Sequence, residues 1–325
     1  MNEVFSLSKE FSTTRSVTYS QPVNPNLLDL QSENMLFIPP SNGRKGEGGL
    51  RIQGYFKLGN PSSSVSDFKK VKPLITIITV VFNCVETLEQ TILSIIEQSY
   101  ENIEYIIIDG GSTDGSLDII HKYENMIDYW VSEEDRGIYD AMNKGLVVAS
   151  GNWVNFMNAG DILYSVNTIK QVFNSTLGAE QIIYGNVHIR YGSFDRVEMA
   201  KNPRKLWRGM QFSHQSIFCD LSYHKKNLFN IENEICADLE FCYKAFKKNI
   251  NFKYEPVIIS SVEVGGASES NRLKTLKLSK VAVSSGGALP LVNLYYFYKY
   301  IDTKLRSYLK LILPDSVIQK LISFK

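Results

Sequence analysis

Apolar residues follow two alternating patterns through the middle of the chain. Segments 74–82, 103–109, 126–132 and 153–157 are short apolar runs rich in β-branched residues, typical of strands buried on both faces. Between these runs, apolar residues recur three and four positions apart, which is typical of amphipathic helices. The alternation predicts an α/β fold, in which a mostly parallel, Rossmann-like sheet is flanked by helices. The helical positions are Leu88, Ile92, Ile95, Ile96, Leu117, Ile120, Tyr123, Ile138, Met142 and Leu146.

Polar residues ahead of these helical stretches predict where two of the helices begin. Thr87 and Gln90 have the spacing of a capping box for the first helix. Ser112 or Thr113 can cap the second helix through its hydroxyl group.

The pattern continues in the second half of the chain. Segments 181–192 and 214–220 are further predicted strands, and 251–268 predicts a strand followed by a glycine turn. Asp238 opens a predicted helix that ends in lysines such as Lys247, the order of charge that a helix dipole favours.

Composition changes at both ends of this patterned region. We expect an N-terminal extension over 1–72 with a linker at 61–67, a main domain over 73–286, and a C-terminal tail over 287–325. The glycine-rich stretch 45–57 predicts a surface loop packed on the main domain, with a role in binding a phosphate or an acceptor as the alternative.

The C-terminal tail predicts an amphipathic, basic helix. Leu305, Leu309, Ile312 and Leu313 fall on one helical face, and lysines and tyrosines flank them. Such a helix can lie in the interface of an anionic membrane leaflet. The alternative is that its apolar face packs on the main domain or on a second subunit.

Charge and motif content exclude several classes of function. A formal net charge of +1 gives no basic field for nucleic acid. The cysteines lack CxxC spacing and predict free thiols in a reducing compartment. There is no signal-peptide pattern, no apolar run of membrane-spanning length, and no GxGxxG, GxSxG or zinc motif. The four cysteines are Cys84, Cys219, Cys236 and Cys242.

Three polar residues follow predicted parallel strands, where ligands of such sheets bind. They are Asn83, Asp109 and Asp161. A carboxylate such as that of Asp109 can accept the imide N–H of uracil or the equivalent edge of guanine, and the glycines after it let a ligand approach the backbone. The alternative for Asp109 is an ordinary turn residue.

Asp161 ends the stretch "NAGD" and is the candidate metal ligand. A sugar nucleotide carries two phosphates, and Mg²⁺ or Mn²⁺ bridging them needs few protein ligands. One carboxylate can therefore suffice, with an oxygen from Asn158 or a water in addition. The alternative is that this stretch is only a turn.

Asp238 is the candidate catalytic base, because a sugar hydroxyl must lose a proton when it attacks an activated sugar. The alternative is a plain helix-capping aspartate. His214 and Gln215 are candidates for the acceptor side of the site, although a lone histidine is more often structural.

Six stretches together resemble the family 2 glycosyltransferases of the GT-A fold, over about 60% of the chain. The longest, from Ser132 to Asp161, is the most specific. The stretches are "PLITIITVVFN" (73–83), "IEYIIIDGGSTDGS" (103–116), "SEEDRGIYDAMNKGLVVASGNWVNFMNAGD" (132–161), "HQSIF" (214–218), "ADLEFCYKAF" (237–246) and "GGAS" (265–268).

The resemblance implies a metal-assisted, inverting transfer from a nucleotide-diphosphate sugar. Asp109 resembles the base-recognising acid, Asp161 the last acid of the family's DxD, and Asp238 the catalytic base, while "NAGD" lacks the first Asp of the DxD. The donor-binding residues expected on these grounds are Asn83, Asp109, Gly110, Asp135, Asn143, Lys144, Asn158 and Ala159.

The "GGAS" ending resembles transferases of bacterial surface polysaccharides such as O-antigen, capsule or colanic acid. This implies a saccharide or polyprenyl-diphosphate-linked acceptor and a cytoplasmic location, on the inner face of the inner membrane. A non-catalytic protein that binds sugar nucleotides remains the alternative. A nucleotidyltransferase is disfavoured, since "NCVETLEQ" (83–90) replaces the glycine-rich, lysine-containing loop expected after the first strand.

Overall fold

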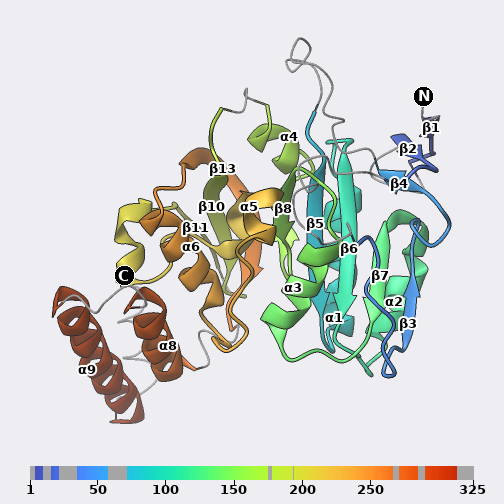
Figure 1. Ribbon diagram of the computed structural model, residues 1–325. Helices are drawn as coiled ribbons and strands as arrows, with labels where there is room; N and C mark the ends of the chain where they lie inside the picture. Colours follow the sequence, from blue (N-terminus) through green and yellow to red (C-terminus); the bar gives the residue numbers. More distant parts are fainter. Residues whose placement is uncertain are drawn as a thin grey trace.

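A ten-stranded mixed sheet forms the centre of the molecule (Figure 1). The computed structural model describes residues 4–9, 16–21, 35–57, 72–174, 178–192, 194–265, 271–284 and 290–312. The strand order is β3-β7-β6-β5-β8-β12-β10-β13-β9, and β11 pairs with β10. The strands are β3 (Gly46–Gly48), β5 (Ile75–Val81), β6 (Ile103–Asp109), β7 (Tyr129–Ser132), β8 (Trp153–Phe156), β9 (Ile162–Leu163), β10 (Ile182–Arg190), β11 (Asp195–Glu198), β12 (Ile217–Asp220) and β13 (Phe252–Glu263).

The four central strands of the first half are parallel, as the sequence predicts. β6 pairs with β7 and β5, and β5 pairs with β8, all in parallel register. Beyond β8 the sheet is mixed, because β12 is antiparallel to both β8 and β10. The carboxyl ends of the four parallel strands therefore meet at one edge of the sheet, which is where a ligand site is expected.

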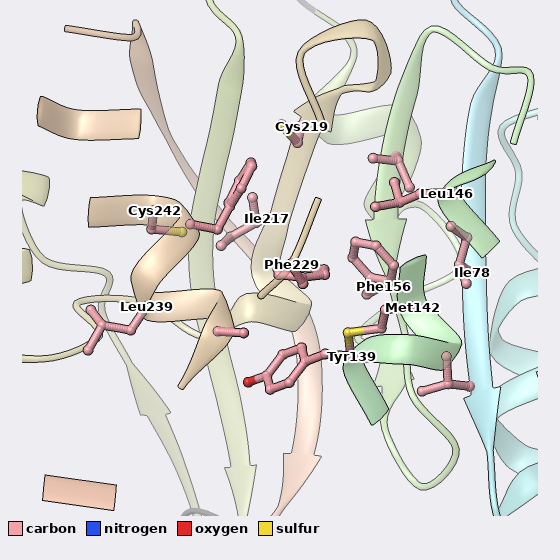
Figure 2. Close-up of a cluster of buried hydrophobic side chains, with 14 of the residues drawn as sticks. Ile78, Tyr139, Met142, Leu146, Phe156, Ile217, Cys219, Phe229, Leu239 and Cys242 are labelled. Carbon is pink, nitrogen blue, oxygen red and sulfur yellow. The ribbon is translucent and has the colours of Figure 1, made fainter. Parts of the chain in front are cut away.

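Helices cover both faces of the sheet, and alternate strand residues point to each. Ile78 and Val80 of β5 belong to one core cluster, whereas Ile75 and Ile77 belong to the other. The first cluster contains residues of α3 (Ile138–Val148), α5 (Leu221–Lys225) and α6 (Ala237–Lys247), and Figure 2 shows part of it. The second contains residues of α1 (Val85–Ile96), α2 (Ser116–Lys122) and α4 (Thr168–Val172). The central strands are buried on both faces because each cluster covers one of them.

The predicted helix caps are wrong, and one aspartate explains why. α1 begins at Val85 and α2 at Ser116, and neither has a side-chain cap from its own N-cap residue. Instead, the carboxylate of Asp114 accepts hydrogen bonds from the backbone N–H of Val85 at 2.9 Å and of Ser116 at 3.0 Å. A single side chain from the intervening loop thus satisfies one N–H group of each helix.

Two predicted strands are shorter than their apolar patterns suggested. In the predicted strand 126–132, only residues 129–132 form β7. Residue 126 ends a 3₁₀ turn, η2 (Glu124–Met126), and residues 127 and 128 connect the turn to the strand. Residues 214–216 form η4 (His214–Ser216) ahead of β12. A third 3₁₀ segment, η3, spans Pro203–Arg208.

Part of the N-terminal segment belongs to the central sheet. β3 lies within the glycine-rich stretch 45–57 and pairs antiparallel with β7, so this stretch supplies an edge strand rather than a loop. A separate three-stranded sheet contains β1 (Phe5–Ser6), β2 (Ser16–Thr18) and β4 (Phe56–Lys57). The predicted linker at 61–67 lies outside the described residues.

Two helices follow the sheet at the C-terminal side, α8 (Arg272–Ser284) and α9 (Pro290–Ile312) (Figure 1). Val292 and Tyr296 of α9 are buried against the first core cluster. No helix within the described ranges is long and apolar enough to cross a bilayer. Residues 266–268 of "GGAS" and 313–325 of the tail lie outside those ranges.

The buried His224 on α5 makes the stability of this fold depend on pH. Its side chain is 2% exposed and stacks on Phe241 with ring centroids 4.1 Å apart. Burial lowers the pKa of His224 to about 4, so the imidazole is neutral in the folded protein at pH 5 and charged in the unfolded chain. Folding then becomes less favourable as pH falls from the unfolded pKa of about 6.5 towards 4.

We expect the free energy of unfolding of the wild type to fall by about 2 kcal/mol more than that of His224→Phe between pH 7 and pH 5. Urea unfolding at the two pH values measures this difference. His121→Phe, at a histidine whose side chain is 51% exposed, is the matched control. Equal losses in the wild type and His224→Phe would contradict the prediction.

Candidate active site

A cavity of about 760 Å³ opens at the carboxyl ends of the parallel strands. Five of the predicted donor-binding residues line it: Asn83, Gly110, Asp135, Asn158 and Ala159. They come from the ends of β5, β6 and β8 and from the loop before α3. Residues distant in the sequence therefore border one space that is large enough for a sizeable ligand.

Asp109 lies beneath this cavity rather than in its lining. Its side chain is fully buried, and its two carboxylate oxygens accept four hydrogen bonds. The donors are the backbone N–H groups of Gly111 at 3.1 Å and Ser112 at 3.0 Å, and the hydroxyls of Ser112 and Ser132, both at 2.5 Å. The carboxylate thus ties the loop after β6 to the end of β7.

The loop held by Asp109 in turn fixes Asn83 at the end of β5. The backbone N–H of Asn83 donates to the Ser112 hydroxyl at 2.8 Å, and Thr113 N–H donates to the Asn83 side chain at 2.9 Å. Asn83 has a φ of 49°, in the left-handed region that asparagine tolerates better than most residues. The strand ends of β5 and β6 therefore form one hydrogen-bonded wall.

Asp135 projects into the same space beside Gly110. Burial raises the pKa of Asp135, and a 2.7 Å hydrogen bond from Gly137 N–H opposes that rise. A Cβ atom at Gly110 would lie 2.4 Å from the Asp135 carboxylate. A larger residue at 110 would therefore displace the Asp135 carboxylate from its present position.

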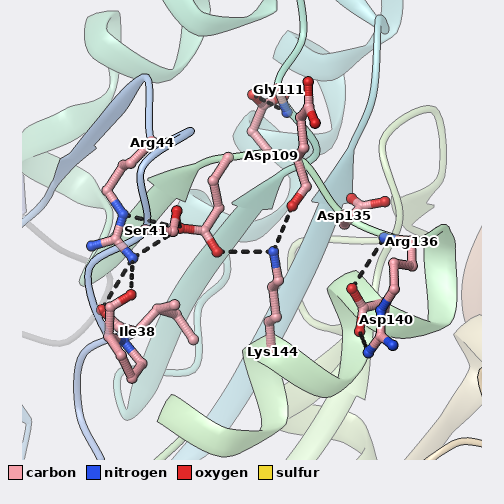
Figure 3. Close-up of polar contacts among 12 residues, drawn as sticks. Ile38, Ser41, Arg44, Asp109, Gly111, Asp135, Arg136, Asp140 and Lys144 are labelled. Atoms are coloured by element: carbon pink, nitrogen blue, oxygen red, sulfur yellow. Dashed lines mark hydrogen bonds and ion pairs between the residues drawn. The ribbon is translucent and has the colours of Figure 1, made fainter.

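Asn143 and Lys144 do not line the cavity. The Asn143 side chain exchanges two hydrogen bonds, each 2.9 Å long, with the backbone of Phe229. Lys144 Nζ donates at 2.9 Å to Glu133 Oε1 and to the carbonyl of Glu134 (Figure 3). Lys144 thus contacts the lining residue Glu134, whereas Asn143 ties α3 to the segment before α6.

The two remaining predicted aspartates are connected through η4. Gln215 Nε2 donates to Asp161 Oδ2 at 2.6 Å, and the Nδ1 atom of the adjacent His214 lies 3.5 Å from Asp238 Oδ2. The other ring nitrogen of His214 lies 3.1 Å from the side-chain amide of Asn158. Neither Asp161 nor Asp238 lines the cavity, but His214 and Gln215 connect them to each other and His214 contacts Asn158 of the cavity lining.

The side chains of Asp238 and His214 lie next to each other and are both partly buried. Burial lowers the pKa of His214, but the hydrogen bond and negative charge of Asp238 outweigh it, so the pKa is raised overall. The Tyr139 hydroxyl lies 3.1 Å from the other oxygen of Asp238. The Asp238 carboxylate is therefore held from both sides, by α3 and by η4.

Asp161 is half-buried, and burial raises its pKa. The Gln215 hydrogen bond and the positive charges of His214 and Arg190 counteract this rise only in part. Its backbone is held by Thr91 of α1, whose hydroxyl donates to the Asp161 carbonyl at 2.8 Å. A partly desolvated carboxylate in this position favours a cation as its partner.

The donor set at Asp161 fits a divalent cation only if a ligand completes it. No group of three or more His, Cys, Asp or Glu side chains within the described part of the chain could hold a metal ion alone. The side-chain amide oxygen of Asn158 is buried and makes no hydrogen bond within that part. One carboxylate and one amide oxygen suit Mg²⁺ or Mn²⁺ when phosphate oxygens supply further ligands.

Several residues of the site carry no sequence signal of their own. Ser132, Tyr139 and Thr91 hold the three aspartates, yet each reads as an ordinary strand or helix residue. Lys45 lines the cavity from outside the patterned region. Only the pairing of distant strands and helices reveals these roles.

Residues 76–251, more than half of the chain, match the family described as "Glycosyl transferase family 2". The chain belongs to this family. Its curated relatives include other glycosyltransferases. The "PGL/p-HBAD biosynthesis glycosyltransferase" of Mycobacterium bovis (strain BCG / Pasteur 1173P2) is 30% identical over 213 residues, which cover 61% of this chain and 80% of the relative. An "Uncharacterized glycosyltransferase" of Haemophilus influenzae is 28% identical over 246 residues, which cover 70% of this chain and 95% of the relative.

Solved structures of glycosyltransferases share the fold of this family 2 enzyme. S. aureus TarS 1-349 superposes with a TM-score of 0.53 at 14% identity, covering 74% of this chain and 75% of TarS. The mannosyltransferase PcManGT from Pyrobaculum calidifontis gives a TM-score of 0.52 at 17% identity, covering 74% of this chain and 72% of PcManGT. The GT-A fold expected from the sequence is confirmed, and the protein is a glycosyltransferase.

We expect Asp109→Asn to lower the free energy of unfolding by about 2–4 kcal/mol. An amide has one accepting oxygen in place of two, so even with that oxygen in the place of Oδ2, the Ser112 hydroxyl that now donates to Oδ1 would face an NH₂ group and lose its acceptor. Urea unfolding measures the loss, with Asp118→Asn on the exposed side of α2 as the matched control. Unchanged stability would show that these hydrogen bonds do not hold the cavity wall.

Proposed function

We propose that this glycosyltransferase moves a sugar from a nucleotide-diphosphate donor to a hydroxyl group of a saccharide acceptor, with inversion at the anomeric carbon. One observation carries the proposal: Asp161 and Asp238 are linked by the adjacent residues Gln215 and His214. A metal-binding acid and a general base are the two groups that such a transfer needs side by side.

The cavity at the strand ends suits the donor. It extends from Asn83 and Gly110 to Asn158 and Ala159, so a ligand that fills it reaches towards Asp161. Two of the structures with this fold are described in complex with sugar nucleotides, TarS with UDP-GlcNAc and PcManGT with GDP-Man and Mn²⁺. A donor of this class, with its diphosphate at the Asp161 end, agrees with both observations.

Asp161, with the amide oxygen of Asn158, would hold Mg²⁺ or Mn²⁺ on the diphosphate. The cation would neutralise the negative charge that grows on the departing nucleoside diphosphate. Gln215 orients Asp161 by donating to one of its carboxylate oxygens, which leaves the other to bind. The missing first acid of the DxD is thus compatible with a cation bound mainly by the ligand.

Asp238 takes the proton from the acceptor hydroxyl. As the acceptor oxygen bonds to the anomeric carbon, the bond from that carbon to the diphosphate oxygen breaks on the opposite face. Tyr139 and His214 hold the Asp238 carboxylate, so its position is set before the acceptor arrives. Such orientation of reacting groups can lower a barrier by about 7–11 kcal/mol.

The acceptor belongs to bacterial surface polysaccharide assembly in this proposal. The support is the resemblance of "GGAS" to transferases of that class, together with a relative named for PGL/p-HBAD biosynthesis. His214 and Gln215 face the acceptor side of Asp238 and Asp161. A polyprenyl-diphosphate-linked saccharide would present its sugar from the cytoplasmic leaflet of the inner membrane.

We expect Asp238→Asn to lower kcat at least about 100-fold while the donor dissociation constant stays within about twofold. The amide keeps the shape and the Tyr139 contact but cannot take a proton. The assay screens UDP-, GDP- and dTDP-sugars with Mn²⁺ or Mg²⁺ and measures release of the nucleoside diphosphate, while calorimetry measures binding.

Asp118→Asn is the control and should retain wild-type turnover. Turnover by Asp238→Asn at the wild-type rate would remove Asp238 from its role as base. A wild-type protein that binds these donors but never releases the diphosphate would favour the non-catalytic sugar-nucleotide binder instead.

We also propose that α9 rests on an anionic membrane surface. Its exposed apolar side chains are 49–65% accessible and recur three and four residues apart along one face. Lys299, Lys304 and Arg306 accompany them, against Asp302 alone. Of the stripe predicted from the sequence, Leu305 is exposed, whereas the side chains of Leu309, Ile312 and Leu313 lie outside the described residues. The exposed face, hereafter the α9 stripe, consists of Leu291, Leu294, Phe297, Tyr298, Ile301, Leu305 and Tyr308.

We expect the triple variant Leu294→Glu, Ile301→Glu, Leu305→Glu to lose at least about tenfold in binding to vesicles that contain anionic lipid, because charge is costly in the apolar interface. Flotation of vesicles with and without phosphatidylglycerol measures binding. Val281→Glu on α8, which replaces an apolar side chain that is 64% exposed outside the stripe, is the matched control. Undiminished vesicle binding by the triple variant would contradict the proposal. So would a change from dimer to monomer with vesicle binding unchanged, because the stripe would then pack on a second subunit.

A further inference from the structure

Lys45 brings a positive charge into a cavity whose other charged lining residues are acids. Among the described residues that line the cavity, Lys45 is the one lysine or arginine, beside Glu134 and Asp135. It lies at the start of β3, outside the residues 76–251 that match the family. The N-terminal segment of this chain therefore contributes a charged group to the donor site.

The Lys45 ammonium group is held in place by the loop that Asp109 organises. Its Nζ donates to the carbonyl of Gly111 at 2.7 Å and to that of Ser112 at 3.3 Å. The backbone N–H of Lys45 donates to the Ser132 carbonyl at 2.7 Å. An ammonium group has three N–H donors, so two contacts leave one donor at the mouth of the cavity.

The neighbours of Lys45 fix the segment that carries it. The Arg44 guanidinium donates to Glu133 Oε2 at 2.9 and 3.1 Å and to the carbonyls of Ile38 and Pro39 at 3.1 and 2.7 Å (Figure 3). It also donates to Glu47 at 2.7 Å. A guanidinium used so fully is a structural anchor rather than a free ligand-binding group. The free donor of Lys45 is thus positioned before any ligand binds.

The glycines of this segment have a packing role that brings Lys45 close. β3 crosses the ring of Trp130 so tightly that a Cβ at Gly46 would lie 2.8 Å from the indole, and one at Gly48 would lie 2.6 Å from it. Larger residues at these positions would push β3 away from β7. Because β3 can approach, Lys45 reaches the cavity.

The order of strands indicates which part of the donor meets Lys45. The reacting end of the site is at Asp161 and Asp238, beyond β8, whereas Lys45 enters from β3 on the opposite side of β7, β6 and β5. A donor whose diphosphate lies near Asp161 therefore extends its nucleoside, the part farthest from the reacting carbon, towards Lys45.

We propose that Lys45 is a specificity-determining residue that donates a hydrogen bond to a carbonyl oxygen of the donor nucleobase. Uracil, thymine and guanine carry such an oxygen at the base edge, and adenine has none. The inference rests on the proposed function, because it needs a nucleotide in the cavity. It deepens that function by assigning recognition of the base to a residue outside residues 76–251, which match the family.

Calorimetry of Lys45→Met with UMP, UDP, GMP, GDP and ADP tests this inference. We expect the nucleotides with a base carbonyl that the wild type binds to lose about tenfold in affinity, by the same factor for mono- and diphosphate. The difference in affinity between these nucleotides and ADP should therefore become smaller. Lys122→Met, at an exposed lysine of α2 that pairs with Glu89, is the matched control and should bind as the wild type does.

Three results would overturn the inference, and they are distinguishable. Unchanged affinity in Lys45→Met, with unchanged thermal stability, would remove Lys45 from the site. A loss that is larger for UDP than for UMP would assign its ammonium to the diphosphate. A wild-type protein that binds none of these nucleotides would overturn the proposed function itself, and the inference with it.

Discussion

The buried carboxylate of Asp109 is the constraint on which the donor end of the site depends. A fully buried charge is tolerated only when hydrogen bonds replace the lost water, and four donors do so here. Those donors lie in the loop after β6 and at the end of β7, so satisfying the carboxylate also joins two strand ends. Ser112 extends the connection to Asn83, and the carbonyls of Gly111 and Ser112 receive Lys45. One charge thus organises three segments of the cavity wall.

The reaction end depends on packing rather than on a buried charge. Residues of β5, β8, α3, β12 and α6 share one apolar core, so the antiparallel half of the sheet is fixed against the parallel half (Figure 2). α6 carries Asp238, and β12 follows the η4 residues His214 and Gln215. Because a packed core resists displacement, His214 and Gln215 are held where they reach Asp238, Asn158 and Asp161.

The sequence predicts the parallel half well because each of its strands is followed at once by its own helix and turn. Strand periodicity and helical spacing are local properties, and they place Asn83, Asp109 and Asp161 at strand ends without knowledge of the partners. Prediction from the sequence fails where a residue's partner in the structure is distant in the chain. Asp114 caps two helices in place of Thr87 and Ser112, and β3 joins the sheet through glycines that read as a loop. Nor does any local pattern show that the side chains of Asn143 and Lys144 bond to other parts of the protein and do not line the cavity.

The two ends of the site also differ in how completely their polar atoms are satisfied. At the Asp109 end of the cavity, the Asp109 carboxylate, the Arg44 guanidinium and the side-chain oxygen of Asn83 make hydrogen bonds within the protein. Near Asp161, the amide oxygen of Asn158 and the Nε of Arg190 are buried without a partner among the described residues, although Arg190 donates elsewhere to the Gly160 carbonyl. Buried polar atoms are rarely left unpaired in a native protein. These two atoms flank the proposed metal ligand, where a cation could pair with the Asn158 oxygen and a phosphate oxygen could accept from the Arg190 N–H. If the proposed function holds, most polar atoms of the wall near Asp109 are paired in advance, whereas those beside Asp161 would gain their partners when the donor and its cation bind.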